Sequence, residues 1–310
     1  MSESMFAMKR PPIVRHYEVS NSPKIRKWME EMSAENVVQT ISALESFPNR
    51  FFNTSHGVAS SNWLADHWRN MARHRPDVVV EQYTHPWPQS SVILTIPGSE
   101  PERGTVILGA HLDSTVGNLK EMESDTVAPG ADDDASGIAS LTEALRVMLD
   151  NDYRPVLTIK FMAYSANELG LLGSAIIAKD FKVREVKVAG VLQLDVTNYV
   201  GDEHNFCLVY DFTDEKQNLF IERLIRTYFP DQEILVAESG FASSDHASWH
   251  GQGYPASFPF NPALEDSPYI HTVNDTLSNS DPTGNHALKL GRLALVYAVE
   301  MGNGSAIMTA

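Results

Sequence analysis

Three consecutive carboxylates, Asp132, Asp133 and Asp134, stand inside the segment 130–137, which begins and ends with glycine. Like charges this close repel one another, so a folded chain needs positive charge near them. Apolar side chains at helical spacing follow over 138–149, which places the run at the start of a helix, where free N–H groups favour anions. The run is therefore either an unusually acidic first turn or part of a cation site.

Further candidate ligands follow apolar strands or lie in loops: His111, Glu168, Asp195 and His271. Singly, each has an ordinary explanation as a turn, helix or loop residue. Together they form a mixed nitrogen and oxygen set without thiolates, which suits zinc or another first-row divalent ion. Asp113, two residues after His111, is suited to hold the second nitrogen of that imidazole. A carboxylate shared by two ions, each with one His and one further carboxylate, would make a two-metal hydrolytic site.

Apolar strands alternate with helices along most of the chain, and several candidate ligands come directly after a strand. This order predicts one α/β domain over 23–302, with a mostly parallel, twisted central sheet flanked by helices on both faces. The site is expected at the carboxyl ends of the strands. Residues 1–22 and 303–310 are expected to be tails. The clearest strands are 105–108, 156–163, 189–194 and 206–209, and the clearest helices are 138–149, 214–228 and 285–301.

The composition is acidic: Asp and Glu number 40 against 24 Lys and Arg, giving a formal net charge of −16. This balance argues against nucleic acid or an anionic membrane as a partner, since both require basic patches. No apolar run approaches the roughly 20 residues of a membrane helix. Cys207 is the only cysteine, and the N-terminus lacks the apolar core of a signal peptide, so the compartment stays open. We expect a monomer.

The sequence also resembles the family of co-catalytic dizinc aminopeptidases, and most closely the secreted bacterial leucyl aminopeptidases. The resemblance spans roughly residues 35–302. In the family the matching motifs carry the metal ligands and the walls of the substrate pocket. The matching segments are His111–Thr115, Ala128–Gly137, Phe161–Tyr164, Gly170–Ser174, Gln193–Asp195, Ser244–His250, Ile270–Thr272 and Asp275–Gly284.

The resemblance implies two Zn²⁺ per chain. It assigns His111 and Asp195 to one ion, Glu168 and His271 to the other, and Asp133 to both as the bridge. It also implies a cis peptide bond between Asp133 and Asp134. Asp113 would orient His111, whereas the segment Asp245-His246 would support the site without binding metal.

One departure from the family pattern falls at the catalytic position. The family has a Glu before the ligand that corresponds to Glu168, and that Glu takes the proton from the zinc-bound water. Here the position is Asn167, whose amide has no basicity near neutral pH. Loss of a general base typically costs ~10²–10⁴-fold in rate. A second departure is Ser239 and Ser243, which stand where close relatives carry two paired cysteines.

The activity implied is removal of the N-terminal residue, preferably large and apolar, from peptides with a free N-terminus. Aromatic and aliphatic pocket walls would favour such a side chain. Each of the residues that match the walls would equally suit an ordinary core. The residues are Val196, Phe241, Phe258, Phe260 and Ile270.

Asn167 leaves alternatives open. The expected enzyme has weakened catalysis, whereas a catalytically disabled homologue would bind metal and peptide without turnover. A glutaminyl-cyclase-like acyltransferase on the same scaffold is a further alternative.

Overall fold

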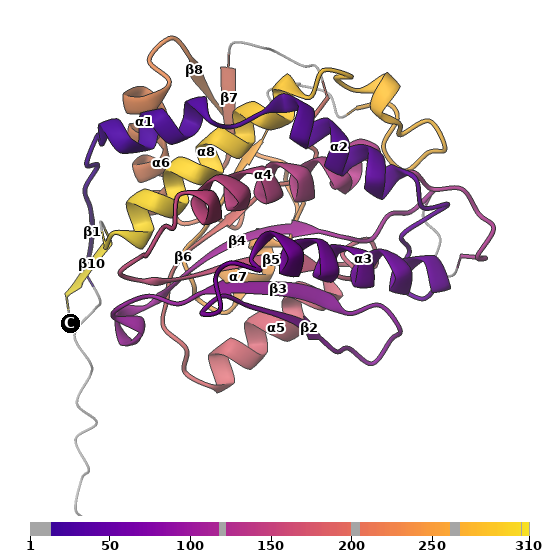
Figure 1. Cartoon of the computed structure of the whole chain (residues 1–310), viewed down its shortest axis with the longest axis horizontal. Helices are drawn as coiled ribbons and strands as arrows, with labels where there is room; N and C mark the ends of the chain where they lie inside the picture. Colours follow the sequence, from indigo (N-terminus) through magenta and orange to yellow (C-terminus); the bar gives the residue numbers. More distant parts are fainter. Residues whose placement is uncertain (1–13, 118–121, 200–204, 261–266, 305, 310) are drawn as a thin grey trace, which may run out of the picture.

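The computed structural model describes residues 14–117, 122–199, 205–260, 267–304 and 306–309. Its centre is an eight-stranded sheet with the order β2-β3-β5-β4-β6-β9-β7-β8 (Figure 1). The strands are β2 (Val79–Tyr83), β3 (Ser91–Ile96), β4 (Thr105–His111), β5 (Thr158–Tyr164), β6 (Val188–Gln193), β7 (Asn205–Val209), β8 (Glu233–Ala237) and β9 (Ala256–Phe260).

The middle of the sheet is parallel: β4 pairs in parallel with both β5 and β6, and β6 with β9. Antiparallel pairs join β2 to β3, β3 to β5 and β7 to β9. Every residue of β4 is buried, as its near-continuous apolar sequence predicts for a strand covered on both faces. The outermost pair on one side, β7 and β8, is again parallel. The expected mostly parallel sheet is confirmed, with these three antiparallel pairs interrupting it.

Helices cover both faces of this sheet, as expected (Figure 1). Their buried side chains belong to two separate apolar clusters, one on each face. The larger cluster includes α1 (Pro23–Glu30), α2 (Ala34–Glu45), α3 (Ser55–Met71), α4 (Gly137–Asp150), α6 (Glu215–Tyr228) and α8 (Asn285–Gly302). The smaller cluster includes α5 (Leu172–Val183) and α7 (His246–Gly251).

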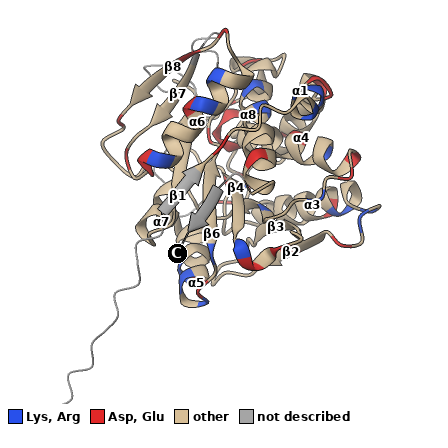
Figure 2. Ribbon diagram, turned by 90° about the vertical axis from the view of Figure 1, so that its left-hand side faces the viewer, with Lys and Arg blue, Asp and Glu red and all other residues tan. Residues whose placement is uncertain are grey.

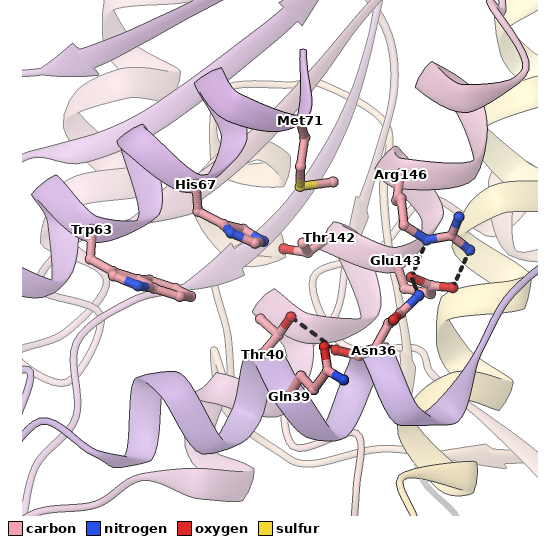
Figure 3. Close-up of a pocket in the computed structure, with 9 residues that line it drawn as sticks. All are labelled: Asn36, Gln39, Thr40, Trp63, His67, Met71, Thr142, Glu143 and Arg146. Atoms are coloured by element: carbon pink, nitrogen blue, oxygen red, sulfur yellow. Dashed lines mark hydrogen bonds and ion pairs between the residues drawn. The ribbon is translucent and has the colours of Figure 1, made fainter. Parts of the chain in front are cut away.

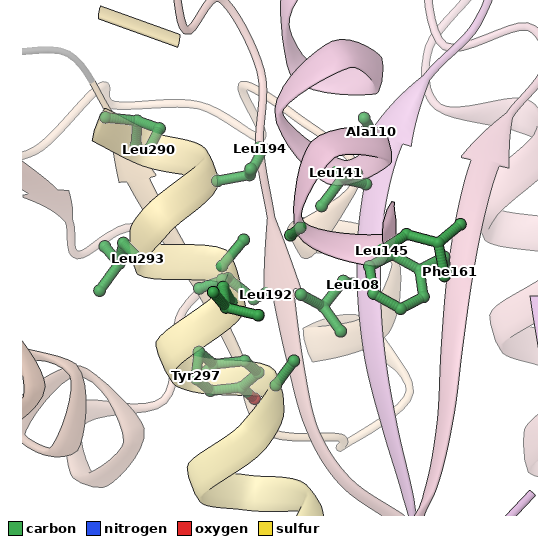
Figure 4. Packing of buried hydrophobic residues seen from close by; sticks show 14 of the residues in the cluster. Leu108, Ala110, Leu141, Leu145, Phe161, Leu192, Leu194, Leu290, Leu293 and Tyr297 are labelled. Carbon is green, nitrogen blue, oxygen red and sulfur yellow. The ribbon is translucent and has the colours of Figure 1, made fainter. Parts of the chain in front are cut away.

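Strand periodicity divides the core between these two faces. Leu108 and Phe161 lie in the larger cluster, whereas their neighbours Ile107 and Met162 lie in the smaller one. This alternation follows from the pleat, which points successive side chains to opposite sides. Figure 4 shows the larger cluster, where side chains of α4 and α8 meet those of the strands. Labelled there are Leu108, Ala110, Leu141, Leu145, Phe161, Leu192, Leu194, Leu290, Leu293 and Tyr297.

The expected tails, 1–22 and 303–310, are in part ordered against each other. β1 (Val14–Tyr17) and β10 (Ala306–Thr309) form an antiparallel pair in which Val14 lies opposite Thr309. Each strand has only four residues, and its partner lies at the other end of the chain, so no local pattern indicates the pairing. Residues 1–13, 305 and 310 lie outside the described residues.

A pocket of about 160 Å³ opens between α2, α3 and α4 (Figure 3). Trp63 and His67 of α3 stack there, facing Glu143 and Arg146 of α4, which form an ion pair. None of the predicted site residues lines this pocket. It is therefore separate from the candidate ligands.

Basic residues are spread over α1, α5 and α6 in Figure 2. Arg75, outside these helices, forms an ion pair with Asp77: its guanidinium lies 2.9 Å from the Asp77 carboxylate. None of the helices in the described residues combines the length and apolar character needed to span a bilayer.

Candidate metal centre

His111 is the last residue of β4, and the parallel neighbours of that strand fix its place. It lies opposite Tyr164, the end of β5, while Gly109 lies opposite Gln193, the end of β6. The His111 side chain is buried, and its Nε2 atom is 2.9 Å from Oδ1 of Asp133 and 3.4 Å from Oδ1 of Asp195. Burial and strand pairing therefore hold this imidazole at the carboxyl edge of the sheet.

The acidic run forms a tight turn ahead of α4, and the peptide bond between Asp133 and Asp134 is cis, as the family resemblance implies. The N–H groups of Asp132 and Asp133 donate to the two carboxylate oxygens of Asp275, at 2.9 and 3.0 Å. A Cβ at Gly137 would collide with the carboxylate of Asp134, so the turn requires glycine there. The backbone of the run is thereby held from outside, leaving the Asp133 carboxylate to face the site.

Asp133 contacts a histidine with each of its oxygens. Oδ1 faces His111, and Oδ2 lies 3.0 Å from Nε2 of His271. The same His271 nitrogen is 3.0 Å from Oε2 of Glu168. His271 comes from the loop after β9 with φ +55°, and the N–H of Gly117 donates to its carbonyl at 2.8 Å. The structure thus brings all five predicted ligands together.

The donor atoms of this cluster fit a metal. Oδ1 of Asp195 and Oε1 of Glu168 are buried without a hydrogen-bond partner. Ligand atoms of His111, Asp133 and Glu168 lie within 4.8 Å of one another, and so do those of His111, Asp134 and Asp195. Buried carboxylate oxygens without donors are costly unless a cation or proton satisfies them.

Asp134 and Asp133 differ in what their carboxylates already bind. Asp134 accepts N–H groups from His111 at 2.9 Å, from Gly137 at 2.9 Å and from Val196 at 3.3 Å. Asp133 instead faces two imidazoles. Both are within reach of a cation by distance, but the oxygens of Asp134 are used by the backbone. Asp133 is therefore the better placed of the two to bridge.

Without metal, protons carry the positive charge of the cluster. Burial raises the pKa of Glu168 to about 8, and the charge of Asp133 adds to this rise. Hydrogen bonds to Asp133 and Glu168 raise the pKa of His271 to about 11. Burial alone would raise the pKa of Asp133, but its contacts with His111 and His271 lower it instead. A metal that binds these groups would displace their protons.

Arg50, which the sequence analysis did not single out, supplies positive charge behind the acidic turn. Its side chain is fully buried, and it donates through Nε to the carbonyl of Leu112 at 2.9 Å and through Nη2 to that of Gly130 at 2.8 Å. Burial lowers the pKa of Arg50, whereas Asp275, Asp134, Asp133 and Asp113 raise it. Arg50 therefore ties together the backbone around two ligand segments.

Asp113 contacts His111 and also the segment that carries Glu168. Its carboxylate accepts the N–H of Asn167 at 2.9 Å and that of Glu168 at 3.1 Å. The Nδ1 atom of His111 lies 3.0 Å from the main-chain oxygen of Asp113 and 3.6 Å from its carboxylate. The residue thus meets His111 mainly through its backbone, while its side chain fixes the segment that carries Glu168.

Asn167, at the position of the family's general base, donates from Nδ2 to Oδ2 of Asp245 at 2.8 Å. Asp245 is fully buried, and the next residue, His246, stacks on Phe258 with ring centroids 4.9 Å apart. The Nε2 atom of His246 lies 3.1 Å from the carbonyl oxygen of Asp211. These contacts agree with the prediction that the Asp245-His246 segment supports the site.

The five predicted pocket residues differ in exposure. Val196 and Phe258 are buried, Phe260 and Ile270 are half-buried, and Phe241 is 62% exposed. Phe258 and Phe260 contact each other with ring centroids 5.4 Å apart. Of the set, Phe241 is the side chain most open to an incoming molecule.

The loop that carries Phe241 is closed by polar contacts at the two positions where the family resemblance implies paired cysteines. The hydroxyls of Ser239 and Ser243 lie 3.3 Å apart. The carboxylate of Asp211 accepts the hydroxyl of Ser239 at 3.2 Å and the N–H of Gly240 at 3.0 Å. Hydrogen bonds thus hold this loop in place of a covalent link.

Comparison with known proteins gives concordant matches. The model for peptidase family M28 matches residues 91–296. Leucine aminopeptidase 1 of Ajellomyces dermatitidis is 34% identical over 284 residues, covering 87% of this chain and 72% of that protein. The structure of the LapA aminopeptidase of Legionella pneumophila has a TM-score of 0.84 and 29% identity, covering 93% of this chain and 76% of that one.

A glutaminyl cyclase of Bacteroides thetaiotaomicron is also similar in structure, with a TM-score of 0.70 and 18% identity, over 86% of this chain and 97% of that one. At this identity the similarity shows the fold alone.

A mostly parallel α/β sheet with histidines and carboxylates gathered at the carboxyl ends of its strands defines a metal-dependent hydrolase. The chain belongs to peptidase family M28, and its resemblance to the dizinc aminopeptidases is confirmed.

Proposed function

We propose that this chain is a monomeric dizinc aminopeptidase with weakened catalysis. The observation that carries the proposal is the Asp133 carboxylate, whose two oxygens face two different histidines at 2.9 and 3.0 Å. Asp195 completes the group around His111, and Glu168 the group around His271. Each half then offers one imidazole, one carboxylate of its own and the shared carboxylate of Asp133.

Bound zinc would polarise the substrate carbonyl and acidify a water. The residues of the chain then position the reactants. Asp113 holds the N–H groups of Asn167 and Glu168, which fixes the ligand and the neighbouring amide together. Asn167 can hydrogen-bond a water through its carbonyl oxygen but cannot keep the proton. Turnover is therefore expected, at a rate ~10²–10⁴-fold below that of an enzyme with a carboxylate base.

The substrate we propose is a peptide with a free N-terminus and a large apolar first residue. Two proteins to which the chain is similar carry names that fit part of this proposal: Leucine aminopeptidase 1 is named for leucine, and LapA is named an aminopeptidase. The carboxylates at the site would favour a cationic α-amine. Phe241, Phe260 and Ile270 keep exposed surface with which to meet an apolar side chain.

The test is hydrolysis of leucine 4-nitroanilide by the zinc-loaded protein. We expect release of nitroaniline in proportion to enzyme, loss with a chelator and recovery with zinc. N-acetyl-leucine 4-nitroanilide, which lacks the free amine, is the matched control and should not be cleaved. Cleavage of both substrates at equal rates would contradict the aminopeptidase assignment.

The second candidate function is that of a catalytically disabled homologue that binds metal and peptide. Only Asn167 favours it. It predicts that the protein binds a non-hydrolysable leucyl analogue but gives no chelator-sensitive turnover. Ring closure of N-terminal glutamine peptides, assayed in parallel, would identify a cyclase instead.

A further inference from the structure

We infer that Asp245 is a positioning residue that fixes which end of the Asn167 amide faces the metal ligands. The inference rests on the proposed function and concerns the same site. It gives a role to the buried carboxylate of Asp245, which is not among the five candidate ligands.

Asp245 is held where only one orientation of Asn167 suits it. Its Oδ2 accepts Nδ2 of Asn167 at 2.8 Å and Nε2 of Gln193 at 3.3 Å. Its side chain is fully buried, and its Oδ1 has no hydrogen-bond partner. The preceding residue, Ser244, donates its hydroxyl to Oδ2 of Asp195 at 2.6 Å, which places this segment directly behind the ligand cluster.

The backbone of Asn167 is fixed independently of its side chain. Its N–H donates to Oδ1 of Asp113 at 2.9 Å, and the next N–H, of Glu168, donates to Oδ2 of the same carboxylate. With its backbone held, Asn167 can change what it presents only by rotation within its side chain. What it presents to the site depends on the group that its other end meets.

An ionised carboxylate only accepts hydrogen bonds, whereas an amide has one accepting and one donating end. Asp245 consequently requires the NH₂ end of Asn167, which leaves the carbonyl oxygen as the end available to the site. A carbonyl oxygen can accept the O–H of an attacking water and orient its lone pair. If the amide were turned, the NH₂ group would donate to that lone pair and oppose attack.

A double-mutant cycle tests this coupling. Asp245→Asn keeps the shape of the side chain but gives Asn167 a partner able to donate, so the amide is free to turn. We expect about a tenfold loss of kcat, the scale of one misdirected hydrogen bond, with KM and zinc content unchanged. In the Asn167→Ala background, where no amide is left to orient, the same Asp245→Asn change should have no effect on kcat.

An equal loss of kcat in both backgrounds would overturn the inference, because Asp245 would then act without Asn167. Loss of zinc from Asp245→Asn would overturn it as well, since the residue would then support the ligands. Asp66→Asn, on an exposed carboxylate of α3, controls for the change in net charge.

A second measurement is independent of turnover. The side-chain NH₂ signals of Asn167 are identified in ¹⁵N spectra of the zinc-loaded protein by their absence from Asn167→Ala. They should exchange slowly with water in the wild type and shift, with faster exchange, in Asp245→Asn. Unchanged signals would refute the positioning role even if the protein proved to have no peptidase activity, so the two failures can be told apart.

Discussion

Oδ2 of Asp133 lies 3.0 Å from Nε2 of His271, although the two residues belong to segments far apart in the chain. The other oxygen of the same carboxylate faces His111 at 2.9 Å. One short acidic side chain is thus shared between two imidazoles that arrive from different elements, β4 and the loop after β9. This sharing underlies the proposed pair of ions.

Replacement of Asn167 by Glu should raise turnover of leucine 4-nitroanilide at least about tenfold, because it supplies the missing general base. The new carboxylate would lie beside the buried Asp245, and a neighbouring like charge raises a carboxyl pKa towards neutrality. The measurement is kcat of both proteins at equal zinc content.

Asn167→Gln is the matched control for that substitution, because it has the length of Glu without the basicity. It should not raise kcat. If Asn167→Glu also fails to raise kcat, the role assigned to position 167 is wrong.

Replacement of Arg50 by Met should destabilise the protein by about 3–5 kcal/mol, since it leaves buried carbonyls and nearby carboxylates without their cation. The carbonyls of Leu112 and Gly130 lose their donors, and both belong to ligand segments. Urea unfolding of the metal-free protein measures the change. Arg69→Met, on a partly exposed residue of α3, should change the free energy of unfolding by less than about 1 kcal/mol; equal losses in both variants would contradict the role of Arg50.

Ionisation of the buried Asp245 carboxylate should lower the free energy of unfolding. Burial raises its pKa from 3.8 to about 6, so its contribution is most favourable below pH 4 and is lost as pH rises through 6. Relative to wild type, Asp245→Asn should therefore gain about 2 kcal/mol of unfolding free energy between pH 4 and pH 8. Urea unfolding of the metal-free proteins at both pH values measures this gain, and a pH-independent difference would contradict it.

A disulfide should form readily between cysteines at positions 239 and 243, whose hydroxyls now lie 3.3 Å apart. Closing so short a loop restricts the unfolded chain by about 2 kcal/mol. The oxidised double variant Ser239→Cys/Ser243→Cys should resist proteolysis at this loop, and reduction should restore wild-type cleavage. Equal cleavage before and after reduction would mean that the loop is already rigid.

The grouping of the five candidate ligands could be predicted from the sequence because strand order places most of them. His111 ends one long apolar strand and Asp195 follows another, and parallel strands bring their carboxyl ends to one edge. Glu168 lies after the next strand, and His271 in a segment that the family resemblance identifies. Strand order and family motifs together were therefore enough to predict that these five residues lie close together.

The supporting contacts could not be predicted in the same way. Arg50 lies in the loop between α2 and α3, which has no periodic pattern. Its role depends on carbonyls of segments that are distant in sequence. Asp245 and Asp275 lie in segments that match the family, but which groups they bind is set by tertiary packing. The pairing of β1 with β10 could not be predicted either, since each strand is too short to give a recognisable sequence pattern.

Anomalous diffraction at the zinc edge, from crystals of the zinc-loaded protein, would show whether two ions share Asp133. We expect two peaks: one contacted by His111, Asp133 and Asp195, the other by Asp133, Glu168 and His271. A single peak, or peaks that Asp133 does not contact, would rule out the proposed shared site.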